Sequence, residues 1–308
     1  MTKYIIKRLL GMIPTLLIII TLSFFIVRIA PGGPFDGERA LPEEVLANIE
    51  AKYHLDEPVL QQYARYLFDV VRGDLGPSYK YVDNDVNFYI FTSLPNSAVL
   101  GSIAILIALS FGILFGILAA VYQNSWIDYL TMGIAVLGIS IPLFVIGPLL
   151  QLVFAMKLHW FPISGWYSTG EGLSTIVLPA ISLSFMYFAT IARLTRSSML
   201  ETLRSEYIRT AKAKGMKNST IIFKHAMKGA MLPIVSYLGP AFAGVITGSI
   251  VIEQVFRVPG IGKFFVQSSF NRDYTLIIGV VIVFSVILVV MNFIVDIVYA
   301  LLDPRIAY

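Results

Sequence analysis

The chain has 308 residues, of which 57% are hydrophobic and only 14% are charged, and its mean hydropathy is +0.78. Soluble globular domains carry about 25% charged residues, so this composition excludes an ordinary water-soluble domain and predicts a protein that crosses a membrane several times. The net charge is only +4, and the absence of cysteine excludes disulfides, thiolate nucleophiles and thiolate metal sites.

Six stretches are apolar and long enough to cross a membrane, which requires about 20 residues of helix. The predicted spans are about Leu9–Ala30, Ser97–Tyr122, Thr131–Met156, Leu173–Ala192, Leu232–Val255 and Thr275–Leu302. We interpret the first stretch as a membrane helix rather than a cleaved signal peptide, because its apolar run is too long for the hydrophobic region of a signal peptide. The spans therefore predict an all-α integral membrane protein.

The two long segments between spans differ strongly in charge. Residues 31–92 contain five cations and eleven acids, a net charge of −6. Residues 193–228 contain nine cations and two acids, a net charge of +7. Because basic loops stay in the cytoplasm, we expect the basic segment and both termini inside and the acidic segment outside.

The acidic segment has the pattern of a small helical cap. Leu41–Leu55 predicts one helix, because Pro42 and two glutamates occupy its first turn. Glu57–Val71 predicts a second helix, with apolar residues recurring at helical spacing. Arg72–Lys80 predicts turns.

The basic segment predicts two short helices. The first has an apolar face formed by Leu200, Leu203, Tyr207 and Ala211. Gly215 lies where a C-terminal cap would end this helix, and Asn218 and Ser219 are suitable N-caps for the next. The second helix carries Ile221, Ile222, Met227 and Met231, with Lys224 and Lys228 on its other side.

The net positive charge of this segment is compatible with three roles. In the first, the cations hold the loop in the cytoplasm, near anionic lipid. In the second they bind nucleic acid, and in the third they flank a helix that docks in a groove of a soluble partner. Nucleic-acid binding is disfavoured, because Tyr207 and Phe223 are the only aromatic residues of the loop that could stack on bases. Charge alone does not choose between the first and the third.

The identity of the residues favours docking. "RTAKAKGM" (Arg209–Met216) followed by "KHAMKGAMLP" (Lys224–Pro233) resembles the cytoplasmic loop of ATP-binding-cassette importer permeases, in the form used by peptide permeases. Similarity to the permease subunits of bacterial oligopeptide importers extends over Pro31–Pro58, Gly73–Tyr81, Pro240–Phe256, Pro259–Tyr274 and Val295–Tyr308. The resemblance covers essentially the whole chain.

The resemblance also implies which residues form the ATPase-coupling loop. They are Glu206, Arg209, Thr210, Ala211, Lys212, Ala213, Lys214 and Gly215. The broad importer pattern begins with Glu-Ala-Ala, whereas Arg209, Thr210 and Ala211 occupy the matching positions here, as in the peptide branch.

Other motifs are absent or have a structural explanation. The chain has no G-x-x-x-x-G-K-[ST] sequence that would cradle ATP phosphates, and none of its three histidines lies in H-E-x-x-H, so we expect neither cofactor nor metal. Gly112 and Gly116 have the G-x-x-x-G spacing of closely packed membrane helices.

Ionisable residues within spans are functional candidates by default. Here they are Arg28, Glu253 and Asp296, all near span ends. We expect Glu253 to pair with Arg257 four residues later and Asp296 to meet a cation of a neighbouring helix.

The scarcity of such residues also bears on the class of protein. A proton- or sodium-driven carrier usually has acids at mid-membrane or helices broken there to bind ions. No acid lies at a span centre, so this alternative ranks second, and Pro142 and Pro179, where a helix can break, keep it open. A membrane enzyme is weaker still, because no nucleophile and base can be named.

The resemblance implies a type I ABC importer permease fold of six spans. Its expected parts are an N-terminal helix (1–30), an extracytoplasmic cap (31–92), a permease domain of five helices with the coupling loop 193–228 (93–302) and a C-terminal tail (303–308). The implied function is alternating-access import of oligopeptides across a bacterial inner membrane. The implied partners are a second homologous permease, two ATP-binding subunits and an extracytoplasmic peptide-binding protein, with no nucleic acid.

Overall fold

The computed structural model describes residues 2–29, 35, 51–81 and 83–302, and the regular elements within these ranges are helices. The α-helices are α1 (Thr2–Ile29), α3 (Val59–Val71), α4 (Val86–Val121), α5 (Trp126–Ser140), α6 (Leu143–Leu150), α7 (Val177–Leu203), α8 (Glu206–Ala213), α9 (Asn218–Thr220), α10 (Met227–Gly248), α11 (Ile250–Phe256), α12 (Gly262–Asn271) and α13 (Tyr274–Leu302). Two π-helical segments, η1 (Gln151–Lys157) and η4 (Ile221–Ala226), continue α6 and precede α10, and two 3₁₀ turns, η2 (Tyr167–Thr169) and η3 (Leu173–Ile176), precede α7.

Five helices in the described ranges are long and apolar enough to cross a membrane, and a bent pair makes six if it counts as one span. The pair joins Trp126–Ser140 to Leu143–Lys157 at an angle of 109°. The span predicted over Thr131–Met156 is therefore broken at Pro142, one of the prolines where the sequence allows a helix to break. The break itself has a local cause: Pro142 lacks an N–H and restricts the preceding residue, and Ile141 has the extended ψ of 121°.

Other predicted spans differ in length from those in the structure. The second begins at Val86 rather than Ser97. The fourth begins at Leu173, as predicted, and continues to Leu203, well beyond the predicted end at Ala192. Pro179 lies in the first turn of α7, where a missing N–H breaks no helical hydrogen bond. The fifth, predicted over Leu232–Val255, is α10 followed by the separate short helix α11.

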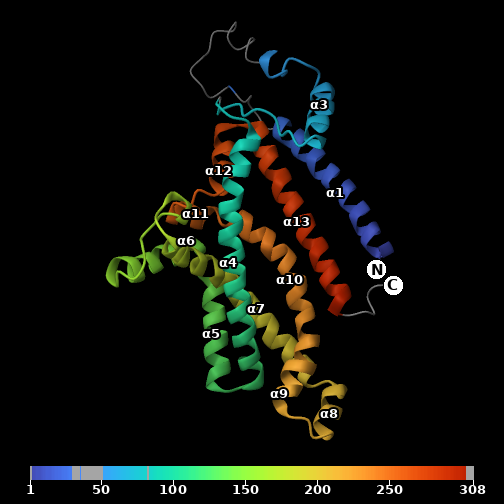
Figure 1. Cartoon of the computed structure of the whole chain (residues 1–308), viewed down its shortest axis with the longest axis vertical. Helices are drawn as coiled ribbons and strands as arrows, with labels where there is room; N and C mark the ends of the chain where they lie inside the picture. Colours follow the sequence, from blue (N-terminus) through green and yellow to red (C-terminus); the bar gives the residue numbers. More distant parts are fainter. Residues whose placement is uncertain (1, 30–34, 36–50, 82, 303–308) are drawn as a thin grey trace.

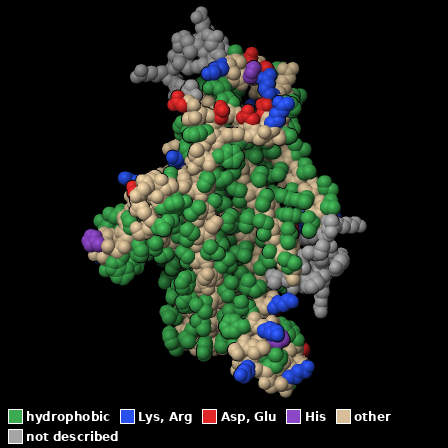
Figure 2. Space-filling view, in the orientation of Figure 1, with side chains coloured by type: hydrophobic (Ala, Val, Ile, Leu, Met, Phe, Trp, Pro, Cys, Tyr) green, Lys and Arg blue, Asp and Glu red, His purple; other side chains and the backbone are tan. Residues whose placement is uncertain are grey.

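The molecule is elongated, with α3 at one end of the bundle and α8 at the other (Figure 1). The arm formed by α6 and η1 projects sideways from the bundle. Acidic side chains gather at the end that carries α3, lysine and arginine gather at both ends, and the surface between the ends is mostly apolar (Figure 2). We call the two ends the cap end and the α8 end.

The cap end agrees with the sequence where it is described. The predicted helix over Glu57–Val71 is confirmed as α3, and the positive φ angles of Gly73 and Gly76 confirm the turns that follow. The predicted helix over Leu41–Leu55 lies largely outside the described residues.

Side-chain hydrogen bonds hold the cap segment on the bundle. The hydroxyls of Thr21 on α1 and Tyr63 on α3 lie 2.7 Å apart, and Arg28 donates to Oε1 of Gln62 at 3.0 Å. The Ser78 hydroxyl and the Tyr79 N–H donate to the buried carboxylate of Asp273, which precedes α13. The segment after α3 is therefore tied to the start of the last span.

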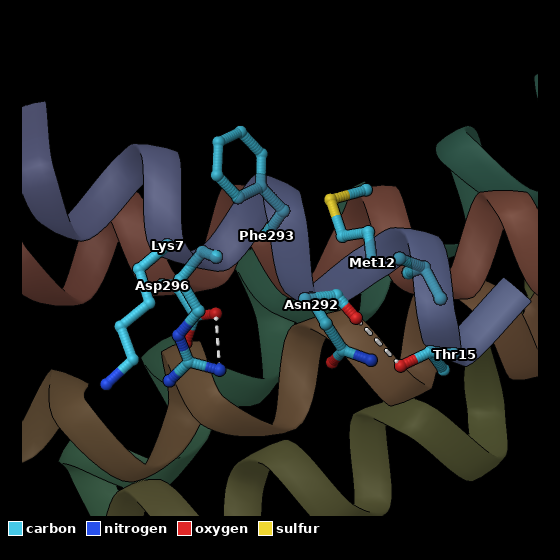
Figure 3. Close-up of a pocket in the computed structure, with 9 residues that line it drawn as sticks. Lys7, Met12, Thr15, Asn292, Phe293 and Asp296 are labelled. Carbon is cyan, nitrogen blue, oxygen red and sulfur yellow. Dashed lines mark hydrogen bonds and ion pairs between the residues drawn. The ribbon is translucent and has the colours of Figure 1, made fainter.

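The first and last spans lie side by side and share an ion pair (Figure 3). Nη1 of Arg8 on α1 lies 3.1 Å from Oδ2 of Asp296 on α13. The expectation that Asp296 meets a cation of a neighbouring helix is confirmed.

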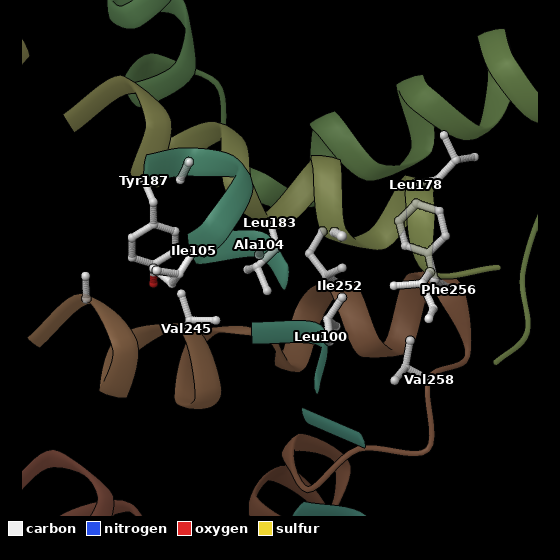
Figure 4. Packing of buried hydrophobic residues seen from close by; sticks show 14 of the residues in the cluster. Leu100, Ala104, Ile105, Leu178, Leu183, Tyr187, Val245, Ile252, Phe256 and Val258 are labelled. Atoms are coloured by element: carbon white, nitrogen blue, oxygen red, sulfur yellow. The ribbon is translucent and has the colours of Figure 1, made fainter. Parts of the chain in front are cut away.

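The centre of the bundle is packed with apolar side chains from four helices (Figure 4). Leu100 on α4, Leu183 on α7, Val245 on α10 and Ile252 on α11 are all fully buried. The core thus lies where α4 and α7 meet the C-terminal part of α10 and α11.

Glycines let α4 and α7 approach closely. A Cβ at Gly112 would lie 2.8 Å from Cγ2 of Ile191, and one at Gly116 would lie 2.5 Å from Cβ of Thr195. Real Cβ atoms do not approach other atoms so closely, so only glycine fits at these two positions. The G-x-x-x-G spacing therefore marks a packing contact, as predicted.

We predict that Gly116→Ala destabilises the protein. A helical glycine replaced by alanine ordinarily favours the helix by about 1 kcal/mol, but here overpacking should cost about 1–3 kcal/mol. The thermal midpoint in detergent should fall.

The matched control is Gly133→Ala on α5, where nothing lies within 4 Å of the added Cβ. Its midpoint should stay the same or rise. Equal midpoints for the two variants would contradict the role given to Gly116.

Candidate functional site at the α8 end

A break of two residues separates α8 from the membrane-spanning helix α7. The Ser205 N–H and hydroxyl both donate to the Thr202 carbonyl, at 3.0 and 2.6 Å, and this closes the end of α7. Ser205 has the extended ψ of 153°, so the chain turns there before α8 begins. The short helix is thus a direct continuation of a span.

The inner face of α8 packs on the bundle. Ile208 is fully buried and Ala211 is 6% exposed. They join an apolar cluster with Ile117 of α4, Met199 of α7 and Ile221 of η4. Because three spans contribute to this cluster, the position of α8 depends on how those spans are arranged.

This face differs in part from the predicted one. Leu200 and Leu203 belong to α7, on the other side of the break, and Tyr207 is half-exposed. Ile208 takes the inward position that the sequence assigned to Tyr207. The predicted period of one continuous helix was wrong because the chain turns at Ser205.

The C-terminus of α8 confirms the predicted glycine cap. Gly215 has a φ of +71°, in the left-handed region. Its N–H donates to the Lys212 carbonyl at 3.0 Å, and the Met216 N–H donates to the Ala211 carbonyl at 3.3 Å. This pair of bonds is the Schellman motif, and Met216 completes it by packing in the same cluster as Ala211.

The second predicted helix begins where expected but does not remain short. It starts at Asn218 and continues through η4 into the span α10. No side chain of Asn218 or Ser219 caps it, because the N-cap position is Lys217. The loop therefore contains one separate helix, α8, and the extended N-terminal end of the fifth span.

The outer face of α8 is small and mixed in charge. Its central residues are Glu206, Arg209, Thr210 and Ala213, all exposed. Nη1 of Arg209 lies 2.8 Å from Oε1 of Glu206, and the Thr210 hydroxyl donates to the Glu206 carbonyl at 3.0 Å. Lys212, Lys214 and Gly215 are exposed beside this face, so Ala211 is the one predicted coupling residue that lies buried.

An ion pair that the sequence did not reveal joins the helices α5 and α7. Asp128 on α5 is 2% exposed and accepts from Nε and Nη2 of Arg196 on α7, at 2.6 and 2.7 Å. The Asn124 N–H adds a third bond at 3.0 Å. Asp128 precedes the predicted third span and lies 68 residues from its partner, so no local pattern could have identified the pair.

A second polar centre lies beyond the C-terminal end of α10, on the side of the cap end. Glu253 on α11 is 2% exposed, and its carboxylate accepts from the hydroxyls of Ser249 and Ser97 at 2.5 and 2.6 Å and from the Gly262 N–H at 2.9 Å.

The structure therefore corrects the predicted pairing of Glu253 with Arg257. The carboxylate instead joins α4, α11 and the first turn of α12. Gly260 and Gly262 allow this: a Cβ at Gly260 would lie 2.3 Å from Cδ of Glu253, and one at Gly262 would lie 2.7 Å from its Oε2. The role of Glu253 here is to hold the corner between the fifth span and α12.

Comparison with known proteins identifies the family. Residues 112–308 match the family described as binding-protein-dependent transport system inner membrane component, and residues 1–84 match the N-terminal family of the same systems. The chain is 52% identical to the oligopeptide transport system permease protein OppB of Salmonella typhimurium and 51% identical to OppB of Escherichia coli K12, over 100% of each chain. It is 46% identical to the dipeptide transport system permease protein DppB of Bacillus subtilis, over 99% of this chain and 98% of that protein.

A solved structure supports the fold independently. The inward-facing MetNI methionine ABC transporter superimposes with a TM-score of 0.57 at 16% identity, covering 70% of this chain and 97% of that one. At this identity the likeness concerns the fold, which is that of the type I ABC importer permeases expected from the sequence. The chain is thus a multi-pass membrane permease, and it belongs to the family of binding-protein-dependent transport system inner membrane components.

Proposed function

We propose that this chain is a membrane-spanning permease subunit of an ATP-driven oligopeptide importer and forms half of the translocation pathway. The observation that carries the proposal is the 52% identity, over the whole length of both chains, to a permease named for oligopeptide transport. Identity falls to 46% for the dipeptide permease of Bacillus subtilis, which favours oligopeptides as the substrate class.

The importer has further subunits. This chain lacks a phosphate-binding loop sequence, so ATP is hydrolysed on two separate ATP-binding subunits. A second, homologous permease completes the pathway, and an extracytoplasmic peptide-binding protein delivers the substrate. The complex lies in a bacterial inner membrane, with both termini of this chain in the cytoplasm, as the charges of −6 outside and +7 inside favour.

The helix α8 carries the motion of an ATP-binding subunit to the spans. Its outer face presents small and charged side chains to a partner, whereas its inner face is fixed to α4, α7 and η4 by the cluster around Ile208 and Ala211. A displacement of α8 is therefore passed to three spans at once. Ala211 acts on the inner side of this link, in the packing of α8 on its own chain, and Ala213 acts on the outer side.

The cap end receives the peptide-binding protein. Its net charge of −6 supplies a surface for electrostatic recognition. The hydrogen bonds of Gln62 and Tyr63 with α1 attach this surface to the spans. The corner held by Glu253 lies at the outer end of the fifth span, where the peptide enters the pathway.

The first prediction from this proposal concerns the division of labour between the permease and the ATP-binding subunits. Reconstituted with its partners, the chain should support peptide uptake that requires ATP and continues in the presence of an uncoupler. Alone, it should neither bind nor hydrolyse ATP, as nucleotide titration would measure. Stoichiometric ATP binding by the isolated chain would contradict the proposal. Loss of uptake on addition of the uncoupler would also contradict it, and would favour an ion-driven carrier.

The second prediction concerns the end of α8. Gly215→Val should leave the chain inserted but uncouple ATP hydrolysis from uptake, because the left-handed conformation costs an L-residue about 1–2 kcal/mol, and a β-branched one more. The added side chain meets no atom within 4 Å of its Cβ, so backbone strain is the only direct effect.

The matched control is Gly215→Asn, since asparagine tolerates this conformation. Insertion, ATPase activity and uptake are measured for both variants in the same complex. If ATP hydrolysis stays coupled to uptake in Gly215→Val, the basic loop only fixes the topology of the chain in the membrane.

The third prediction separates the two faces of α8. Ala213→Trp should reduce uptake and assembly with the ATP-binding subunits without changing the thermal midpoint, because Ala213 is exposed. Ala211→Glu should lower the midpoint as well as coupling, because it buries a charge in the apolar cluster. Lys212→Ala should be mild, since exposed ion pairs contribute about 0–1 kcal/mol. Full assembly and uptake by Ala213→Trp would exclude this face as the docking surface.

A further inference from the structure

A pocket of about 500 Å³ lies between the N-terminal half of α1 and the C-terminal half of α13 (Figure 3). One end of it is charged, with Lys7 and Arg8 from α1 and Asp296 from α13. This pocket belongs to neither α8 nor the cap.

The described residues that line the pocket carry a net positive charge. Arg8 is paired with Asp296 at 3.1 Å, which leaves one positive charge in excess. That charge is on Lys7, which is exposed and forms no ion pair with any residue in the part of the chain that the structure describes. The charged end therefore favours an anion.

Away from its charged end the pocket has both apolar and polar lining. On each helix an apolar side chain comes first, Met12 on α1 and Phe293 on α13, and a polar one follows, Thr15 and Asn292 (Figure 3). Thr15 lies about 12 Å along α1 from Lys7, at 1.5 Å per residue. The pocket is therefore longer than a bare anion, and its lining offers apolar contacts as well as a hydroxyl and an amide.

The apolar part of the lining distinguishes between anions. Met12, Val289 and Phe293 line the pocket with apolar side chains. A free phosphate ion or a small carboxylate would leave these side chains without a contact. An acyl chain attached to the anion would cover them.

We propose that this pocket binds one anionic phospholipid, with its phosphate beside Lys7 and Arg8 and an acyl chain along α1 and α13. Basic pockets between spans are recognised sites for anionic headgroups on the cytoplasmic side of membranes, which is the side on which the charge distribution places the start of α1. The lipid fills the space between the first and last spans and stabilises their contact. This inference is independent of which substrate the importer carries.

Gly11 provides a direct test. It lines the pocket, and no atom lies within 4 Å of a Cβ added to it, so Gly11→Leu fills the pocket without a clash at Cβ. The matched control is Gly133→Leu on α5, which has the same open surroundings. Lys7→Gln removes the excess charge and leaves the space.

Each full-length variant is purified from nanodiscs of equal parts phosphatidylglycerol and phosphatidylcholine, and the retained lipid is counted by native mass spectrometry. The wild type and Gly133→Leu should retain one phosphatidylglycerol. Lys7→Gln should lower the preference for phosphatidylglycerol about fivefold, the factor expected for one cation at a membrane surface. Gly11→Leu should abolish retention.

Three outcomes would overturn the proposal. The first is equal retention of phosphatidylglycerol by all four proteins. The second is thermal stabilisation of the wild type by inorganic phosphate as strong as that by phosphatidylglycerol, which would make the ligand a free anion. The third is cross-linking of Gly11→Cys to another subunit of the complex, because the chain has no other cysteine and the pocket would then be a subunit interface. Uptake is measured in parallel, so that loss of the lipid with normal transport leaves the proposed function standing.

Discussion

The close approach of α4 and α7 is the contact on which the rest of the structure depends. Between helices in a membrane there is little hydrophobic driving force, so van der Waals contact and buried polar groups hold them together. Gly112 and Gly116 supply that contact by letting Ile191 and Thr195 sit against the backbone of α4. Because α7 leads directly into α8, this packing also sets where α8 emerges.

Buried carboxylates make the other long-range connections. Asp128 joins α5 to α7, Glu253 joins α11 to α4 and α12, and Asp273 joins the start of α13 to the segment after α3. Each accepts at least three hydrogen bonds, which is what makes a buried charge tolerable. A carboxylate whose partners lie on different helices also fixes their relative position, so these residues act at the ends of spans rather than along them.

Both ends of the molecule are fixed by apolar packing. At the α8 end, Ile208 and Ala211 pack against α4, α7 and η4, and the opposite face of α8 is exposed. At the cap end, Tyr63 and Leu67 of α3 pack in a second apolar cluster with Phe24 of α1. Hydrogen bonds between α1 and α3 add to this packing at the cap end.

The sequence by itself determined the features that depend on neighbouring residues: the apolar spans, the helix α3, the glycine cap at Gly215 and the close packing at Gly112 and Gly116. Each follows from hydropathy, helical period or the conformational freedom of glycine, which act within a few residues. The predicted coupling residues are exposed, except Ala211, and their role stays a prediction.

Only the tertiary structure decided the rest. The 109° bend at Pro142, the inward position of Ile208 and Ala211, and the partners of Asp128 and Glu253 depend on contacts between spans far apart in the chain. A proline permits a helix to bend but does not give the direction. Likewise, a lone acid at the end of a span indicates that hydrogen-bond donors must lie near it, but it does not identify them. Asp128 accepts from a residue 68 positions away and Glu253 from one 156 positions away. Which donors each acid receives depends on how the helices pack.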